Sequence, residues 1–295
     1  MNKFFEDEEV SIKNILVIDM MNLVFRTVNS SFRNNPLDLE FHEWKSNMFI
    51  TLFSYIKLFK PERVVIALDS SNTWRKEIYP DYKGKRKDNR DSSPIDYDKF
   101  FSVYRDFENS LRNTFKNFLF IKSETAEADD IVAVIAKKYN KTYTKVICVS
   151  NDGDLKQLVK YKNYSQYDPM KKKMVEIYDP EHYLISKILF GDSADNIPHV
   201  ENGKGQVKCE KNAKRLSEYL AESNNEVRQR FQLNKSLIDM DLIPERICKD
   251  ILDKYDNYNT EKIESYSIYD FFVKERLGNL IEDSQKYLFL IKDLK

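Results

Sequence analysis

Three short runs rich in β-branched residues, each followed closely by an aspartate, constrain the fold of this chain more than any other feature. The runs span residues 15–18, 63–68 and 145–150, and the aspartates are Asp19, Asp69 and Asp152. Short apolar runs of this kind are typical of strands that are buried on both faces of a parallel sheet. The sequence therefore predicts three such strands, together with a weaker fourth at residues 118–121.

Helical periodicity separates the predicted strands. Apolar residues recur at spacings of three and four within residues 44–59 and 100–115, which is the pattern of helices with one buried face. Strands that alternate with helices form right-handed βαβ units and a parallel sheet that is covered on both faces. We therefore predict an α/β fold with a helical region towards the C-terminus.

The three aspartates are expected to lie at one edge of this sheet. In open parallel sheets, ligands bind in the crevice outside the carboxyl ends of the strands. A single aspartate at the end of a strand is more often a turn or helix cap, but three at the same edge are hard to explain in that way. The sequence therefore predicts an acidic crevice.

Two further acidic groups accompany the strand ends. Glu127, Asp129 and Asp130 begin an apolar helix that is predicted to reach about residue 139, and the helix dipole explains one or two of these acids but not all three. Asp192 and Asp195 follow a glycine that we expect to end a helix, and an Asx-rich turn is the alternative interpretation. The candidate metal ligands are Asp19, Asp69, Glu127, Asp129, Asp130, Asp152, Asp154, Asp192 and Asp195.

So many carboxylates in one crevice would raise each other's pKa values unless cations neutralised them. Oxygen ligands select hard ions, and Mg²⁺ binds through a few carboxylates and the phosphates of a substrate. Nine acids suit two ions better than one, and a pair of ions can assist the displacement at a phosphodiester. We therefore expect two Mg²⁺ ions, with Mn²⁺ able to substitute. A calcium loop beginning at Asp152 is excluded, because Gln157 and Asn163 stand where such a loop needs Gly and Glu.

The segment from residue 74 to residue 90 is basic and contains interleaved aromatic residues. Such a composition can follow a phosphate backbone while the aromatic rings stack on bases. Since the segment comes soon after Asp69, we expect it to overhang the crevice, and a solvated loop is the alternative. A second basic region begins at Lys204. The candidate nucleic-acid-binding residues are Arg75, Tyr82, Lys83, Lys85, Arg86, Lys87, Lys204, Lys208 and Lys211.

Composition excludes several other classes of protein. Lys plus Arg and Asp plus Glu both number 48, so only local charge can indicate a polyanionic partner. Three scattered cysteines favour a reduced compartment without structural zinc, and no glycine-rich nucleotide loop is present. The sequence has no membrane-spanning apolar run and no signal-peptide pattern, so we expect a cytoplasmic protein, in the host cytoplasm if it is viral.

Five acidic motifs occur in an order that is specific to one family. Strand-terminal Asp19 and Asp69 are followed by E-A-D-D at residues 127–130, D-G-D at residues 152–154 and G-D-x-x-D-N at residues 191–196. Across about residues 14–200 this pattern resembles the phage-type 5′ nucleases of the flap endonuclease superfamily, within it most closely the T-even ribonuclease H branch. The resemblance implies a PIN-like, resolvase-like parallel sheet and a helical arch over a two-magnesium site.

The resemblance also implies roles for individual residues. Lys83 and Arg86 match a Y-K-G-x-R stretch that approaches the scissile phosphate. The first ion would be held by Asp19, Asp69, Asp129 and Asp152, with Glu127 reaching it through water and Asp130 in an outer layer. The second ion would be held by Asp154, Asp192 and Asp195. The implied catalytic residues are Asp19, Asp69, Lys83, Arg86, Glu127, Asp129 and Asp152.

The predicted organisation is a nuclease core over residues 1–185, with a basic arch at about 70–95, and a helical region over residues 186–295. Compared with the family it resembles, the latter departs from most relatives after residue 196, and we expect it to contain a degenerate helix–turn–helix-like segment for duplex binding. The resemblance implies a monomer that removes RNA primers and adjoining DNA from 5′ ends or flaps during lagging-strand replication. Its substrates would be DNA and RNA–DNA hybrid.

The resemblance implies a single-strand-binding protein and a sliding clamp as partners, the clamp through a docking peptide at residues 4–8, for which a frayed terminus is the alternative interpretation. Two alternatives stay open at the level of sequence. A PIN-like endoribonuclease uses a similar acidic crevice, but it needs neither a basic arch nor the Asp192 and Asp195 pair. A non-catalytic nucleic-acid-binding protein could use its carboxylates to hold structural ions.

Overall fold

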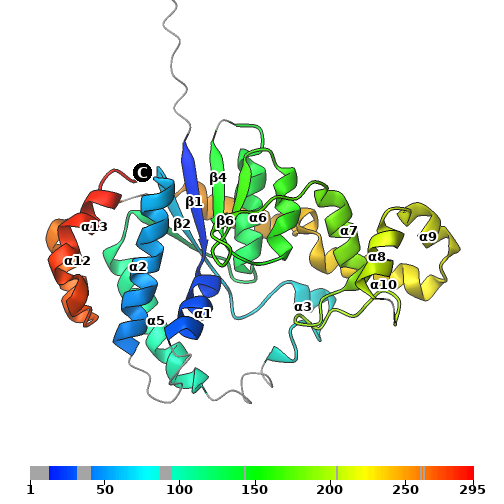
Figure 1. The fold of residues 1–295 in the computed structure, drawn as a ribbon, viewed down its shortest axis with the longest axis horizontal. Coiled ribbons are helices and arrows are strands. Elements are labelled where there is room, and N and C mark those ends of the chain that lie inside the picture. The colour runs from blue at the N-terminus through cyan, green and yellow to red at the C-terminus, as the bar shows by residue number, and fades with distance from the viewer. Residues whose placement is uncertain are drawn as a thin grey trace, which may run out of the picture.

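A six-stranded sheet organises the chain in the computed structural model, which describes residues 13–31, 41–86, 95–142, 144–203, 205–259, 261 and 263–295. The strand order is β3-β2-β1-β4-β5-β6 (Figure 1). The strands are β1 (Asn14–Asp19), β2 (Arg63–Leu68), β3 (Phe118–Lys122), β4 (Lys145–Val149), β5 (Tyr164–Asp168) and β6 (Lys173–Met174). The four predicted strands are confirmed and pair in parallel.

Strands β5 and β6 were not predicted. β5 joins the parallel set beside β4, and β6 pairs with it in the antiparallel direction. The sequence of β5, Tyr-Ser-Gln-Tyr-Asp, lacks β-branched residues and alternates between buried and half-buried positions. It therefore carries none of the apolar signal that marks a strand buried on both faces.

Helices cover both faces of the sheet, as predicted. One face packs against α1 (Met20–Ser31), α2 (Phe41–Phe59), α5 (Tyr97–Thr114), α12 (Ser265–Lys274), η3 (Gly278–Asp283) and α13 (Ser284–Ile291). The other packs against α6 (Ala128–Tyr139), η1 (Asp154–Lys160), η2 (Met240–Leu242) and α11 (Glu245–Asp256). Successive residues of β1 alternate between these two cores, since Leu16 and Ile18 belong to the first and Ile15 and Val17 to the second.

A third apolar cluster lies to one side of the sheet. It is formed by α7 (Pro180–Phe190), α8 (Gln206–Ala213), α9 (Leu216–Glu222) and α10 (Asn225–Ile238), together with Tyr82 from the basic segment. Figure 1 shows these helices projecting from the sheet on the side opposite α12 and α13. The short helix α3 (Arg75–Ile78) lies between them and the sheet. The helical C-terminal region thus contacts both sheet faces and the basic segment, and the predicted boundary at residue 185 stays a prediction.

The register of the central strands places the predicted aspartates at one edge. Asp19 of β1 pairs with Ala67 of β2, and Ile18 pairs with Val149 of β4. Asp69 comes two residues after Ala67, and Asp152 comes three residues after Val149. All three aspartates therefore lie close to the carboxyl ends of these strands. Among the described residues, no helix is long and apolar enough to cross a membrane.

Candidate active site

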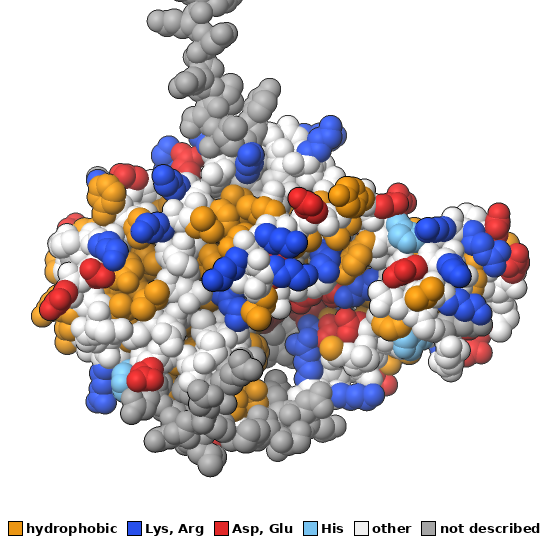
Figure 2. All heavy atoms as spheres, in the orientation of Figure 1, with side chains coloured by type: hydrophobic (Ala, Val, Ile, Leu, Met, Phe, Trp, Pro, Cys, Tyr) orange, Lys and Arg blue, Asp and Glu red, His pale blue; other side chains and the backbone are white. Residues whose placement is uncertain are grey.

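A cleft of ≈ 780 Å³ opens at the carboxyl edge of the sheet. Its acidic lining comes from the ends of three strands and the start of α6. Figure 2 shows acidic side chains in a hollow near the centre of this face, with Lys and Arg side chains around it. The charged residues of the lining are Asp19, Arg26, Asp69, Lys83, Arg86, Glu127, Asp129 and Asp152. The predicted acidic crevice is therefore present.

Two of the strand-terminal aspartates also act as backbone caps. Asp19 accepts a hydrogen bond from the backbone N–H of Asn22 at 3.0 Å, in the first turn of α1. Asp69 accepts one from the N–H of Ala128 at 3.0 Å, at the start of α6. Each carboxylate has a second oxygen, so the same residue can cap a backbone N–H and also line the cleft.

Burial and mutual repulsion make these carboxylates resist ionisation. Burial, together with Asp69 and Asp152, raises the pKa of Asp19 to about 7. Burial, followed by Asp152 and Asp19, raises the pKa of Asp129 well above its usual value. Burial is also the main cause that raises the pKa of Asp69 and of Asp152. A divalent cation would remove this repulsion, so the charge distribution fits a metal site.

The geometry of the donor atoms also fits hard metal ions. Asp129, Asp152 and Asp154 offer carboxylate oxygens that lie within 4.8 Å of one another. Asp152 accepts a hydrogen bond from the backbone N–H of Asp154 at 2.8 Å, which fixes the D-G-D turn. An all-oxygen donor set without Cys or His ligands is suited to Mg²⁺ or Mn²⁺.

Lys187 of α7 is a site residue that sequence reasoning missed. Its ammonium group pairs with Asp154, and it lies 3.2 Å from Asp192 Oδ2. Asp192 also accepts hydrogen bonds from the backbone of Ala194 and Asp195, so the predicted Asx turn is present as well. The signal was a lysine in the last turn of a largely apolar helix that leads directly into the G-D-x-x-D-N motif.

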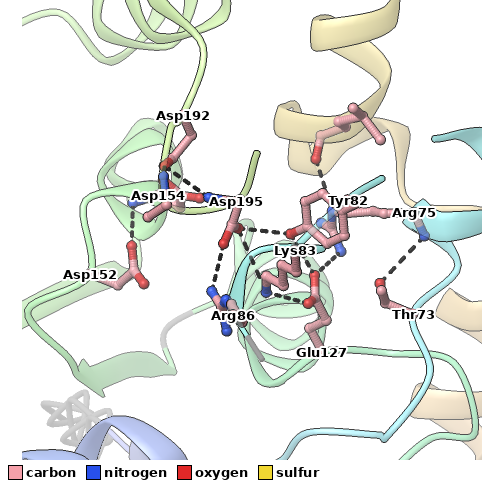
Figure 3. A network of polar contacts seen from close by, with 12 residues as sticks. Thr73, Arg75, Tyr82, Lys83, Arg86, Glu127, Asp152, Asp154, Asp192 and Asp195 are labelled. Carbon is pink, nitrogen blue, oxygen red and sulfur yellow. Dashed lines mark hydrogen bonds and ion pairs between the residues drawn. The ribbon is translucent and has the colours of Figure 1, made fainter. Parts of the chain in front are cut away.

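The side chains of Tyr82, Lys83 and Arg86 tie the basic segment to the acidic cleft, as drawn in Figure 3. Lys83 pairs with Glu127, and Arg86 Nη2 lies 2.6 Å from Asp195 Oδ1. The Tyr82 hydroxyl contacts Glu127 at 3.0 Å and Asp195 at 2.9 Å. Burial alone would raise the pKa of Asp195, but Lys83 and Arg86 hold it below its usual value. The segment therefore overhangs the crevice as predicted, and the solvated-loop interpretation is wrong for Tyr82, Lys83 and Arg86, whose side chains contact the carboxylates.

The structure corrects the prediction that Arg75 and Tyr82 contact nucleic acid. Their exposed fractions are 4% and 3%, and their polar groups are bound to carboxylates inside the protein. Asp130 is also misplaced as a metal ligand, because it is fully buried and its oxygens accept hydrogen bonds from Arg75, Trp74 and the backbone N–H of Glu127. It lies behind Glu127, in the outer layer that the resemblance implied.

The other predicted nucleic-acid contacts have different positions. Lys85 is exposed beside the cleft, and Lys208 and Lys211 are exposed on α8. Lys87, Lys204 and the predicted docking peptide at residues 4–8 lie outside the described residues. The same is true of the part of the predicted arch between residues 87 and 94.

An acidic cleft suited to divalent cations at the carboxyl edge of a parallel sheet, with lysine and arginine on its rim, is typical of phosphodiester-cleaving enzymes. Residues 14–187 match the family described as 5′-3′ exonuclease, N-terminal resolvase-like domain. Residues 207–287 match the family described as T4 RNase H, C terminal. The chain belongs to the 5′-3′ exonuclease family, which confirms the resemblance, and it is a nuclease that hydrolyses phosphodiester bonds.

Individual relatives agree with this assignment. The ribonuclease H of Enterobacteria phage T4 is 28% identical over 244 residues, covering 76% of this chain and 79% of the relative. The flap endonuclease of Escherichia phage T5 is 28% identical over 216 residues, covering 68% of this chain and 70% of the relative. A solved complex of the T5 flap endonuclease with DNA and metal ions has the same fold, with a TM-score of 0.64 and 19% identity over 94% of this chain and 99% of that one.

Proposed function

We propose that this nuclease depends on Mg²⁺ and removes RNA primers and adjoining DNA from 5′ ends and flaps during lagging-strand replication. The observation that carries the proposal is the cleft itself, in which strand-terminal carboxylates face Lys83 and Arg86. Asp19, Asp69, Asp129 and Asp152 are the residues that would hold a first ion. Asp154, Asp192 and Asp195 would hold a second. When bound, two such ions supply the charge that activates the attacking oxygen and neutralises the leaving one.

Lys83 and Arg86 supply the protein's own positive charge at the cleft. Glu127 and Asp195 hold their donor groups over the acidic lining. A phosphate that entered the cleft would therefore meet donors that are already oriented, and such donors stabilise charge that develops in a transition state. Because these groups recognise a phosphodiester and not its sugar, we expect cleavage of both RNA and DNA strands.

The substrate class is supported by the relatives and by the surface charges. One relative is a ribonuclease H and another is a flap endonuclease. Exposed Lys85 beside the cleft, and exposed Lys208 and Lys211 on α8, provide further cations for a phosphate backbone. We therefore propose DNA and RNA–DNA hybrid with free 5′ ends as the substrates.

The decisive experiment compares three substrates that carry a 5′ label: a flap, a nicked duplex and an RNA–DNA hybrid, each with and without Mg²⁺. We expect short labelled products from all three, and only when Mg²⁺ is present. Cleavage within the RNA strand alone, at positions that do not depend on the 5′ end, would favour a PIN-like endoribonuclease. Binding of all three substrates without any product would favour a non-catalytic binding protein.

A metal titration of Asp192→Asn tests the second group of acids. Loss of even an outer partner of a metal ligand costs about 10–100-fold in metal affinity. We therefore expect the Mg²⁺ concentration that gives the half-maximal rate to rise at least about tenfold. Asp179→Asn is the matched control, because Asp179 caps the other end of α7 through the N–H of His182 at 2.8 Å. If Asp192→Asn left the titration curve unchanged, Asp192 would serve only its Asx turn, which asparagine can also form.

A further inference from the structure

The guanidinium group of Arg75 lies behind the wall of the cleft and bonds to three residues on two segments, the start of α6 and the end of α10. Nη1 donates to Glu127 Oε2 at 2.8 Å, and Nη1 and Nη2 donate to the two oxygens of Asp130 at 3.0 Å and 2.8 Å. Nε donates to the carbonyl oxygen of Leu237 at 2.8 Å, near the end of α10. The group also lies 4.5 Å from the ring centroid of Trp74. Such a planar, fully bonded guanidinium is held in one orientation.

The two carboxylate oxygens of Glu127 contact different cations, Arg75 and Lys83. Burial alone would lower the pKa of Arg75, but Asp130 and Glu127 raise it, so the group stays charged. Oε2 of Glu127 accepts hydrogen bonds from Arg75 and the Tyr82 hydroxyl, whereas Oε1 pairs with Lys83. Lys83 lines the cleft and Arg75 does not. The contact with Arg75 therefore leaves Oε1 as the oxygen on the cleft side.

The third contact of Arg75 reaches a buried junction at the end of α10. Asn234, with an exposed fraction of 0%, donates to the carbonyl oxygens of Ile188 and Pro198, which flank the turn that carries Asp192 and Asp195. In the same region, Gln157 donates to the carbonyl oxygens of Ile238 and Asp154 at 3.0 Å each.

The end of α10 thus contacts the segments that carry the second group of acids. Arg75 joins this junction to Glu127 at the start of α6. A single buried guanidinium thereby connects the supports of both groups of acids.

We propose that Arg75 is a positioning residue of the metal site: it orients Glu127 towards the cleft and fixes it relative to the segments that hold Asp154, Asp192 and Asp195. This inference rests on the proposed metal-dependent function. It predicts that loss of Arg75 weakens the binding of divalent ions and leaves the affinity for nucleic acid unchanged.

The test must separate positioning from simple stability. Arg75→Gln alone would leave Asp130 as an uncompensated buried charge, which strongly destabilises a fold. The informative variant is therefore the double substitution Arg75→Gln/Asp130→Asn, in which both partners are neutral. Asp130→Asn alone is the matched control, since the introduced amide can still accept a hydrogen bond from Trp74 while Arg75 keeps its bonds to Glu127 and Leu237.

Three measurements are made on each variant and on Glu127→Gln: thermal unfolding, calorimetric binding of Mn²⁺ without substrate, and binding of a flap oligonucleotide in EDTA. We expect the double variant to unfold within a few degrees of Asp130→Asn. We expect it to bind Mn²⁺ at least about tenfold more weakly than the control, as Glu127→Gln does. Flap binding in EDTA should be equal in all variants.

Each contrary outcome has a distinct meaning. Equal Mn²⁺ affinity in the double variant and in Asp130→Asn would show that Arg75 only stabilises the fold, and would overturn the inference. Weaker flap binding in EDTA with a smaller salt dependence would instead make Arg75 a phosphate contact. If the wild-type protein bound no Mn²⁺, the proposed function would fail first, whatever the variants did.

Discussion

Asp19→Asn and Asp152→Asn are each expected to lower the single-turnover cleavage rate by on the order of a thousandfold. Each variant lacks one carboxylate of the proposed metal site, and bound metal ions contribute several kcal/mol of transition-state stabilisation. We do not expect either substitution to destabilise the fold. Burial and neighbouring acids already raise the pKa of both carboxyls, so a neutral amide removes a repulsion. We expect an unchanged or higher midpoint of thermal unfolding and unchanged flap binding in EDTA.

Asp168→Asn provides the control for this pair. Asp168 ends β5 at the same edge of the sheet and is 8% exposed, but it does not line the acidic cleft. Its oxygen accepts from the backbone N–H groups of Met170 and Lys171, so its role is that of a turn cap. Asparagine can fill that role, and the variant should keep its cleavage rate. Full activity of Asp19→Asn and Asp152→Asn at saturating Mg²⁺ would refute the two-ion assignment.

The second large effect is expected from the double substitution Lys83→Ala/Arg86→Ala. If the two groups act on charge that develops at the scissile phosphate, a preorganised donor there is worth about 3–4 kcal/mol. The single-turnover rate at saturating enzyme should then fall on the order of a hundredfold or more, beyond any loss of affinity. The structure favours this outcome, because Glu127 and Asp195 hold the two side chains over the cleft.

Lys85→Ala is the matched control, since Lys85 lies between the two residues in sequence but is exposed and contributes nothing to the lining of the cleft. We expect a small loss of affinity that diminishes at high salt, as for any screened phosphate contact. A bulky block on the 5′ end of the flap should stop cleavage by the wild-type protein if the flap is threaded beneath the arch. Wild-type rates for the double variant would show that the basic segment only attracts the substrate.

The amino-acid sequence by itself determined the central strands and the acidic edge. Both signals are local, because each apolar run and the aspartate after it are contiguous in the chain. A parallel sheet then places the carboxyl ends of its strands at one edge, whatever the details of packing. For the same reason the helix after Glu127 and the glycine that ends α7 could be predicted: Gly191 has a φ of 72°, which few other residues adopt.

Only the tertiary structure decided which charged groups face the cleft and which face inward. Asp129 and Asp130 are adjacent in sequence, yet successive residues of a helix point in different directions, so Asp129 lines the cleft and Asp130 turns back to Arg75. Arg75 has the appearance of a surface residue in the sequence, because its partners Glu127 and Asp130 lie 52 and 55 positions away. Lys187 was missed for a related reason, because its partner Asp154 is distant in sequence. The sequence shows the sign of each charge, but the packing of the fold decides which group that charge contacts.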